Sequence, residues 1–180
     1  MPLDENAKAA NVVGSIQQYF EDHLGAVLNS SASAIDYGGG LPFVDAALAE
    51  WVQVRAMGPA RPEAGQGPYA ARAGTDADSR GAEILWLLNI NCFVRPAKQV
   101  PLSNLRPYQL RDLVLDVIRE GTRIPVKDYA DLTSQGGETI GYLDVSDLIE
   151  DRTVQDPART DLLQYNVVFA MRWTETWHAP

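Results

Sequence analysis

The sequence predicts an α+β fold, with a mainly antiparallel β-sheet covered by two α-helices in one domain spanning residues 1–180. Two windows carry apolar residues at three- and four-residue steps, the period of an amphipathic helix. Other windows alternate apolar and polar residues, the period of a strand with one buried face. Because the windows follow one another as helix, strands, helix and strands, we expect the helices to pack on a single sheet.

Residues 5–28 form the first predicted helix. Its apolar face consists of Val12, Val13, Ile16, Tyr19, Phe20, Leu24, Val27 and Leu28. Polar residues such as Gln17 and Glu21 occupy the opposite side. Asp4 is placed to cap the N-terminus, and the polar residues 29–31 break the helix. One face of this helix is therefore expected to dock on a flat apolar surface.

Two segments in the first half predict a large hairpin. Residues 51–56 alternate apolar and polar side chains. Residues 82–94 alternate over a longer stretch, and Leu85 and Leu87 make part of it apolar on both sides, as in a central strand. A shorter extended piece is expected near residues 35–37.

Residues 58–81 connect these strands and predict a long flexible loop. The segment is rich in Gly, Ala and Pro, and Tyr69 is almost its only large residue. A structureless connection of this length is uncommon in a compact domain and is usually functional or disordered. We expect an assembly arm, with the candidate contact residues Arg61, Tyr69, Arg72 and Arg80.

The second half predicts one more helix and three extended segments. The helix covers residues 107–120, with Pro107 in its first turn and Gly121 as its stop. The three strands are expected at residues 123–129, 139–145 and 163–177. Polar, turn-rich loops are expected at residues 131–138 and 150–161.

Charge and composition narrow the function classes. The 24 acidic and 15 basic side chains give a formal net charge of -9, which argues against a protein whose main task is to bind nucleic acid. The single cysteine excludes an intramolecular disulfide and a Cys-rich zinc cage. No stretch approaches the roughly 20 apolar residues of a membrane span, so a soluble protein is expected.

Residues suited to catalysis are sparse, and the sequence predicts neither an enzyme nor a cofactor. His23 and His178 are expected to be structural or solvent-exposed. Cys92 falls on the inward series of a strand, where a buried apolar role is typical. Residues 38–40 are three glycines but lack the Lys and Ser/Thr that follow in a phosphate-binding loop, so they predict a turn.

Two further groups of residues leave alternatives open. The acidic cluster consists of Asp144, Asp147, Glu150 and Asp151. A solvated acidic edge is favoured for it, against a metal-dependent hydrolase or nuclease that uses Asp144 and Asp147. The candidate interface aromatics are Trp51, Trp173 and Trp177, divided between core and interface roles. A monomeric ligand-binding module that uses the tryptophans is the remaining alternative.

The order of these elements resembles that of the tail terminator proteins of long-tailed bacteriophages. The resemblance covers nearly the whole chain and depends on the first helix, the Trp-Val-Gln-Val strand at residues 51–54, the long insertion, the strand at residues 84–90, the second helix and the closing strand at residues 165–169. Related neck and head–tail joining proteins share much of this pattern. The length of residues 58–81 departs from it.

This resemblance implies a structural virion protein. It would form a homohexameric ring on the end of the tail tube, stop tube polymerisation, and offer a surface to the head-side connector. DNA would pass through the ring without specific binding, and an acidic lumen, with the acidic cluster as a candidate lining, would repel phosphates. The location would be the virion tail or neck, after assembly in the host cytoplasm. The runner-up is a head completion or connector protein that contacts the portal side of the capsid.

Overall fold

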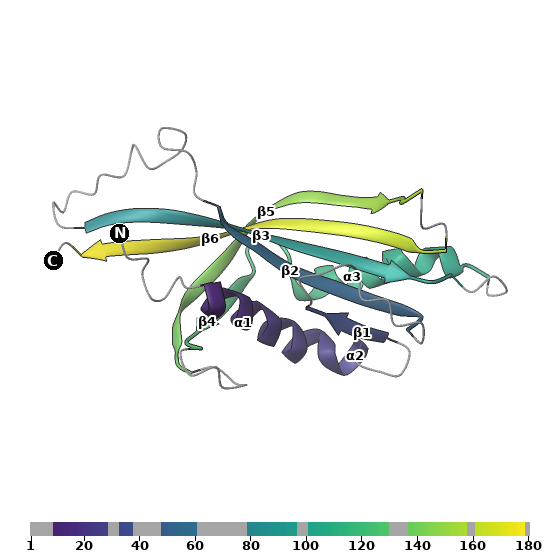
Figure 1. Ribbon diagram of the computed structural model, residues 1–180, viewed down its shortest axis with the longest axis horizontal. Helices are drawn as coiled ribbons and strands as arrows, with labels where there is room; N and C mark the ends of the chain where they lie inside the picture. The colour runs from purple at the N-terminus through teal and green to yellow at the C-terminus, as the bar shows by residue number, and fades with distance from the viewer. Residues whose placement is uncertain are drawn as a thin grey trace.

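The computed structural model describes residues 9–28, 33–37, 48–60, 79–96, 101–129, 137–157 and 161–178. Within these residues, six strands form one sheet in the order β1-β2-β3-β6-β5-β4 (Figure 1). The strands are β1 (Ser33–Asp36), β2 (Glu50–Ala60), β3 (Ser79–Val94), β4 (Arg123–Lys127), β5 (Thr139–Val154) and β6 (Leu163–His178). All neighbours are antiparallel except β1 and β2, which are parallel. The predicted α+β fold with a mainly antiparallel sheet is confirmed.

Two helical segments pack on the same face of this sheet. The first runs through α1 (Ala9–Phe20), a π-helical turn η2 (Glu21–Gly25) and α2 (Ala26–Leu28). The second is a 3₁₀ turn η4 (Ser103–Leu105) followed by α3 (Arg106–Val117). The α3 helix ends three residues before the predicted Glu120, because Ile118 is extended. The predicted cap Asp4 lies outside the described residues.

The helix-covered face of the sheet holds the main hydrophobic core. Apolar side chains at alternate positions of β2, β3 and β6 meet the apolar stripes of α1 and α3, as period-two and helical periodicities require. The largest fully buried members of this core are Trp86, Phe20, Phe169, Ile16, Leu24, Leu28, Leu88, Ile90, Leu110 and Ile118. A paired guanidinium and carboxylate, Arg106 and Glu50, joins the start of α3 to β2 with N–O distances of 2.6 and 2.8 Å.

The opposite face of the sheet carries no described helix and has a polar row. One residue from each of five neighbouring strands stands at the same level: Asp36, Gln53, Asn91, Asn166 and Arg152. Gln53 Nε2 donates a hydrogen bond to Asp36 at 2.8 Å. Gln164 Nε2 donates one to Asn91 Oδ1 at 2.7 Å. The same strands therefore present an apolar surface to the helices, and on the other side a hydrogen-bonded polar row next to a small apolar cluster of Trp51 and Phe93.

Strand boundaries differ from the predicted ones on both sides of the long loop. The predicted hairpin is confirmed, because β2 pairs with β3 from Glu50↔Val94 onward. However, β2 continues to Ala60 and β3 begins at Ser79, so strand replaces the first and last three residues of the predicted loop. The ends of β3 and β6 pair as far as Ser79↔His178 and extend past the helices (left in Figure 1).

The strand β5 is much longer than expected. The prediction ended it at residue 145 and placed a loop from residue 150, but β5 continues to Val154. Two register shifts, at Val145/Asp147 and Leu148/Glu150, insert extra residues into the strand. Each shift moves the alternation by one position, so the sequence loses the period-two pattern that identifies a strand.

Candidate assembly surfaces

The outer edge of β2 is only half covered. The short strand β1 pairs with Glu50–Gln53 and then ends. Beyond that point, in the part of the chain that the structure describes, residues 54–60 pair with β3 on one side and have no strand on the outer side. We call this segment the β2 open edge. A strand edge without a neighbouring strand leaves backbone donors and acceptors available to another strand.

A groove lies directly along this open edge. Its β2 side is formed by four consecutive residues, Val54, Arg55, Ala56 and Met57. Its other side is formed by Val13, Ile16 and Gln17 of α1 and by Tyr37, which follows β1. The enclosed volume is about 330 Å³. An extended segment placed at the edge would therefore also find room for side chains against α1.

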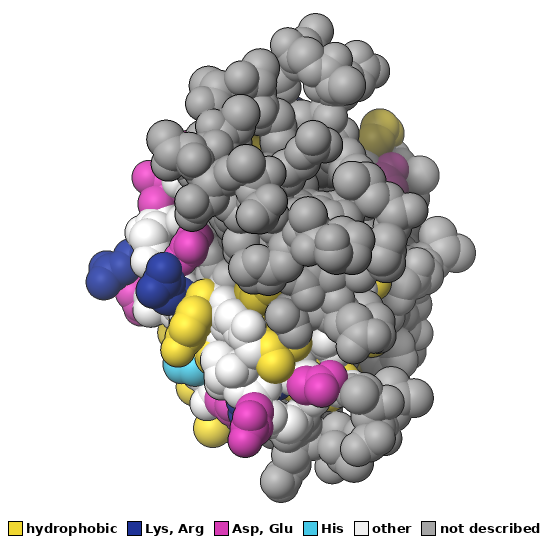
Figure 2. All heavy atoms as spheres, turned by 90° about the vertical axis from the view of Figure 1, so that its left-hand side faces the viewer, with side chains coloured by type: hydrophobic (Ala, Val, Ile, Leu, Met, Phe, Trp, Pro, Cys, Tyr) yellow, Lys and Arg dark blue, Asp and Glu magenta, His cyan; other side chains and the backbone are white. Residues whose placement is uncertain are grey.

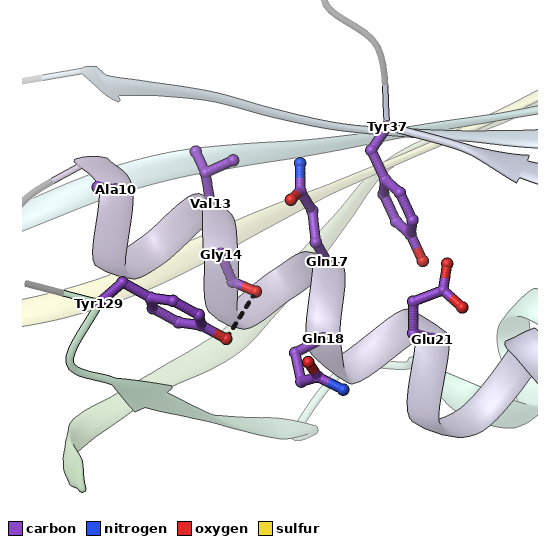
Figure 3. Close-up of a pocket in the computed structure, with 8 residues that line it drawn as sticks. All are labelled: Ala10, Val13, Gly14, Gln17, Gln18, Glu21, Tyr37 and Tyr129. Atoms are coloured by element: carbon purple, nitrogen blue, oxygen red, sulfur yellow. Dashed lines mark hydrogen bonds between the residues drawn. The ribbon is translucent and has the colours of Figure 1, made fainter. Parts of the chain in front are cut away.

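A second groove continues along α1 and is shown in Figure 3. It has a volume of about 450 Å³ and shares Val13, Gln17 and Tyr37 with the first. Tyr129 bounds its far end, where the Tyr129 hydroxyl donates to the carbonyl oxygen of Gly14 at 3.1 Å. A Cβ at Gly14 would come within 3.0 Å of the Tyr129 ring, so glycine permits this close contact.

The second groove has negative character. In Figure 3 the Tyr37 hydroxyl points toward the Glu21 carboxylate across the groove. Burial and the nearby charges of Glu21 and Asp22 raise the pKa of Tyr37. Burial and the charge of Asp22 also raise the pKa of Tyr129. Both phenols therefore stay protonated at neutral pH.

The predicted acidic cluster is not a single acidic surface. Each of its carboxylates has a guanidinium partner: Asp144 with Arg123, Asp147 with Arg172, Glu150 with Arg152, and Asp151 with Arg111. The cluster is also divided between the two faces of the sheet. Asp151 stands opposite Val167 of the helix-covered core, whereas Glu150 stands opposite Val168 on the other face. Asp144 and Asp147 are largely exposed, as expected for a solvated edge, but all four acids are ion-paired; the lumenal role stays a prediction.

Mixed charge is also visible at one end of the molecule. Figure 2 views the end that lies at the left of Figure 1, and the coloured acidic and basic side chains there lie beside one another. Elsewhere among the described residues, Arg123 makes a similar mixed-charge contact, because its Nε donates to Asp144 at 2.8 Å while its guanidinium lies over the Tyr142 ring. Both partners in this ion pair are largely exposed.

The outer edge of β5 has a protected part and an open part. The strand β4 pairs with β5 only as far as Asp144. The amide of Val145 donates to Thr122 O, and the amide of Leu148 donates to Glu120 Oε1, both at 2.8 Å. After these contacts, no strand among the described residues lies on the outer side of residues 149–154, the side opposite β6, and we call this side the β5 open edge. Ile149, at its start, is 56% exposed.

Two of the candidate interface tryptophans are buried inside the subunit. Trp51 is 0% exposed and stacks on Phe93 with a centroid distance of 5.0 Å, and Arg95 lies over its ring. Trp173 is 6% exposed and packs against Gly141. Their assignment as interface residues is wrong, because strand pairing directs both rings into packed clusters. The backbone of Trp177 lies in β6, and its side chain is outside the described residues.

The candidate arm residues lie mostly beyond what the structure describes. Arg61, Tyr69 and Arg72 are outside the described residues. Arg80 was expected in the loop, but its backbone pairs with Trp177 in the β3–β6 ladder. Sequence reasoning did not single out Met57 or Ile149, the exposed apolar residues at the two open edges. Ile149 follows Leu148 within a polar stretch, and two adjacent apolar residues in such a stretch are a sequence pattern that could have indicated a contact surface.

The residues considered for catalysis have ordinary environments. Cys92 is buried, and burial raises the pKa of its thiol to about 12. His23 is exposed, stacks on Tyr19, and places Nδ1 2.7 Å from the Tyr19 carbonyl oxygen. His178 ends β6, and its side chain is outside the described residues. Across the described ranges, no three His, Cys, Asp or Glu side chains gather closely enough to hold a metal ion. Within the same ranges, no helix has the length and apolar character of a membrane span.

Comparisons with known proteins give no family assignment. No protein-family model matches the chain, and no curated protein matches it. One solved structure, of a protein that carries no descriptive name, aligns over 92% of this chain and 96% of its own, with 12% identity and a TM-score of 0.46.

Proposed function

We propose that this chain is a structural virion subunit that forms a ring on the end of a bacteriophage tail tube, terminates tube polymerisation and provides the head–tail joining surface. The observation that supports this proposal is the presence of two open strand edges on opposite sides of one sheet. A subunit with two different, complementary patches forms head-to-tail contacts, which close into a ring when the rotation permits.

The proposed partners follow from that role. The chain forms a homohexamer, contacts the tail tube protein on one side and the head-side connector or neck protein on the other, and lies in the virion. DNA passes through the ring without specific binding, since the net charge of -9 per subunit opposes phosphate attachment. Each acid of the predicted lumenal cluster has an arginine partner, so the net charge of the whole subunit, and not this cluster alone, opposes phosphate attachment.

Tube length tests this function directly. Tail tube protein from the same virus is polymerised with and without the purified chain, and tube lengths are measured by negative-stain electron microscopy. We expect capped tubes that stop elongating, with a ring at one end and a hexamer mass by native mass spectrometry. Tubes of unchanged length, with the chain bound only to portal rings, would instead support the head completion protein. A chain that binds neither tubes nor portal rings would overturn the proposal.

A further inference from the structure

We propose that the β2 open edge of one copy pairs with the β5 open edge of the next copy, so that the sheets of neighbouring subunits join into one continuous sheet. The occupant of the groove beside β2 is thus residues 149–154 of a second copy. This inference rests on the self-assembly in the proposed function and names the contact surfaces that accomplish it.

Strand direction favours this arrangement. The strands β2 and β3, β3 and β6, and β6 and β5 are all antiparallel pairs. Therefore β5 runs opposite to β2 within each subunit. When a second copy is placed beside the first by rotation, with its helices on the same side, its β5 meets β2 in the antiparallel sense. The alternation of strand direction then continues across the junction without interruption.

The exposed side chains at the two edges are complementary. Met57 on β2 is 41% exposed, and Leu148 and Ile149 on β5 are 38% and 56% exposed. Association at these edges would remove Met57 and Ile149 from water, and Leu148 borders the contact; loss of exposed apolar area is favourable. The groove beside β2 adds the apolar side chains of Val13, Ile16 and Ala56, against which the incoming strand can pack.

Charged side chains also meet on the helix-free face. Arg55 lies on the helix-free side of β2, since it alternates with the core residues Val54 and Ala56. Glu150 lies on the corresponding side of β5, opposite Val168, and is paired with Arg152. Pairing the two edges therefore brings Arg55 to the face that carries this ion pair, where a cross-strand carboxylate is a favourable neighbour of a guanidinium.

A symmetric pairing of β2 with β2 is less complete. It would cover one edge of each subunit and leave Leu148 and Ile149 in solvent. The head-to-tail pairing covers both edges of every subunit once the ring closes. The protection of the first part of β5 by Thr122 and Glu120 limits the contact to residues 149–154.

Cross-linking of mixed single-cysteine variants tests the pairing. Met57→Cys and Ile149→Cys are purified separately, mixed, assembled and treated with a short bismaleimide. The native Cys92 gives little background because it is buried. We expect a covalent dimer joined between positions 57 and 149 in the mixture and at least tenfold less dimer in either variant alone. The matched control mixes Met57→Cys with Val27→Cys, an exposed α2 position at 58%, and should yield no such link.

A second variant measures assembly without cross-linking. Met57→Lys adds charge to the open edge, a change that opposes edge pairing, and should raise the concentration needed for half-maximal ring formation at least tenfold. Val27→Lys should leave it unchanged. The monomer of each variant is checked by circular dichroism, so that misfolding is recognised.

The outcomes separate this inference from the proposed function. Rings that cap tail tubes but give no 57–149 link would overturn the edge pairing and leave the function standing. Rings that give the link but leave tube length unchanged would support the pairing and reject the function. Dimers linked between two copies of position 57 would replace the head-to-tail contact with the symmetric one. A chain that stays monomeric at all concentrations and on tubes would overturn both.

Discussion

The two faces of the central strands differ in chemistry although they share one backbone. On the helix-covered face, Ile90 and Phe169 are buried among apolar side chains from α1 and α3. On the other face, the neighbouring Asn91 is also buried, but it takes part in hydrogen bonds with Gln164 and Asn89. Asn91 is thus nearly as buried as its apolar neighbours on the other face, while the interactions that accompany its burial are different.

This difference shows how the two faces contribute to the fold. Apolar burial is non-directional and scales with area, so the helix-covered face supplies most of the stabilisation. Hydrogen bonds between buried amides contribute less net free energy but are costly when one partner is lost. Because the polar row aligns one residue from each of five strands, a register slip would separate its partners. The polar face therefore favours one register.

The largest effect is expected on the apolar side. Phe169→Ala removes a large side chain that is 1% exposed, so it should lower the free energy of unfolding by about 3–5 kcal/mol. Urea denaturation monitored by circular dichroism measures the change. The control is Arg172→Ala on the same strand, at an exposed position. Equal effects of the two substitutions would contradict the division between the faces.

Overpacking the same core should have the next largest effect. A Cβ at Gly141 would lie 1.8 Å from Cη2 of Trp173, so Gly141→Ala forces the indole or the strand to move. We expect a loss of about 1–3 kcal/mol, the usual range for overpacking a core. The control is Gly121→Ala, because a Cβ there meets no atom within 4 Å but the backbone φ is +84°. Its cost measures backbone strain alone, whereas the cost of Gly141→Ala includes the collision with Trp173. If Trp173→Leu does not reduce the cost of Gly141→Ala, the contact with the indole is not its cause.

A smaller effect is expected from the polar row. Asn91→Ala leaves the half-buried Gln164 amide without its 2.7 Å acceptor and should cost about 1 kcal/mol. A double-mutant cycle with Gln164→Ala should return a coupling energy of about 0.5–1.5 kcal/mol. Strict additivity would show that the two amides do not stabilise each other.

The smallest effect concerns pH and the ion pair that joins α3 to β5. The Arg111 guanidinium lowers the pKa of Asp151, and its Nε donates to Asp151 Oδ1 at 3.0 Å. Since the pKa is lower in the folded state, this contribution is fully present above the usual Asp pKa of 3.8 and is lost as pH falls below it. Asp151→Asn should therefore flatten the decline in stability between about pH 5 and pH 2 relative to the original chain.

The control for this pH effect is Arg111→Gln, which removes the cation and keeps the carboxylate. It should flatten the same part of the curve, because the pKa of Asp151 then returns toward its usual value. Thermal melts at intervals of half a pH unit provide the measurement. A decline that is as steep in both variants as in the original chain would show that other groups dominate acid unfolding.

Local periodicity in the sequence determined the main elements. The helical spacing of residues 9–28, the alternation along β3 and β6, and the hairpin between β2 and β3 were all predicted correctly, because each pattern reflects neighbours within one element. The buried position of Cys92 followed from the same alternation. Patterns of this kind specify which side of an element is buried, and that information is local.

Only the tertiary structure decided the surfaces. The two register shifts in β5 hid its true length. The arginine partners of three of its four acids are distant in sequence, as for Arg111 and Asp151, which are 40 positions apart. Likewise, the burial of Trp51 and Trp173 and the open edges of β2 and β5 depend on which strands become neighbours. Contacts between separate elements depend on how those elements meet in space, and a one-dimensional pattern of polarity does not contain that arrangement.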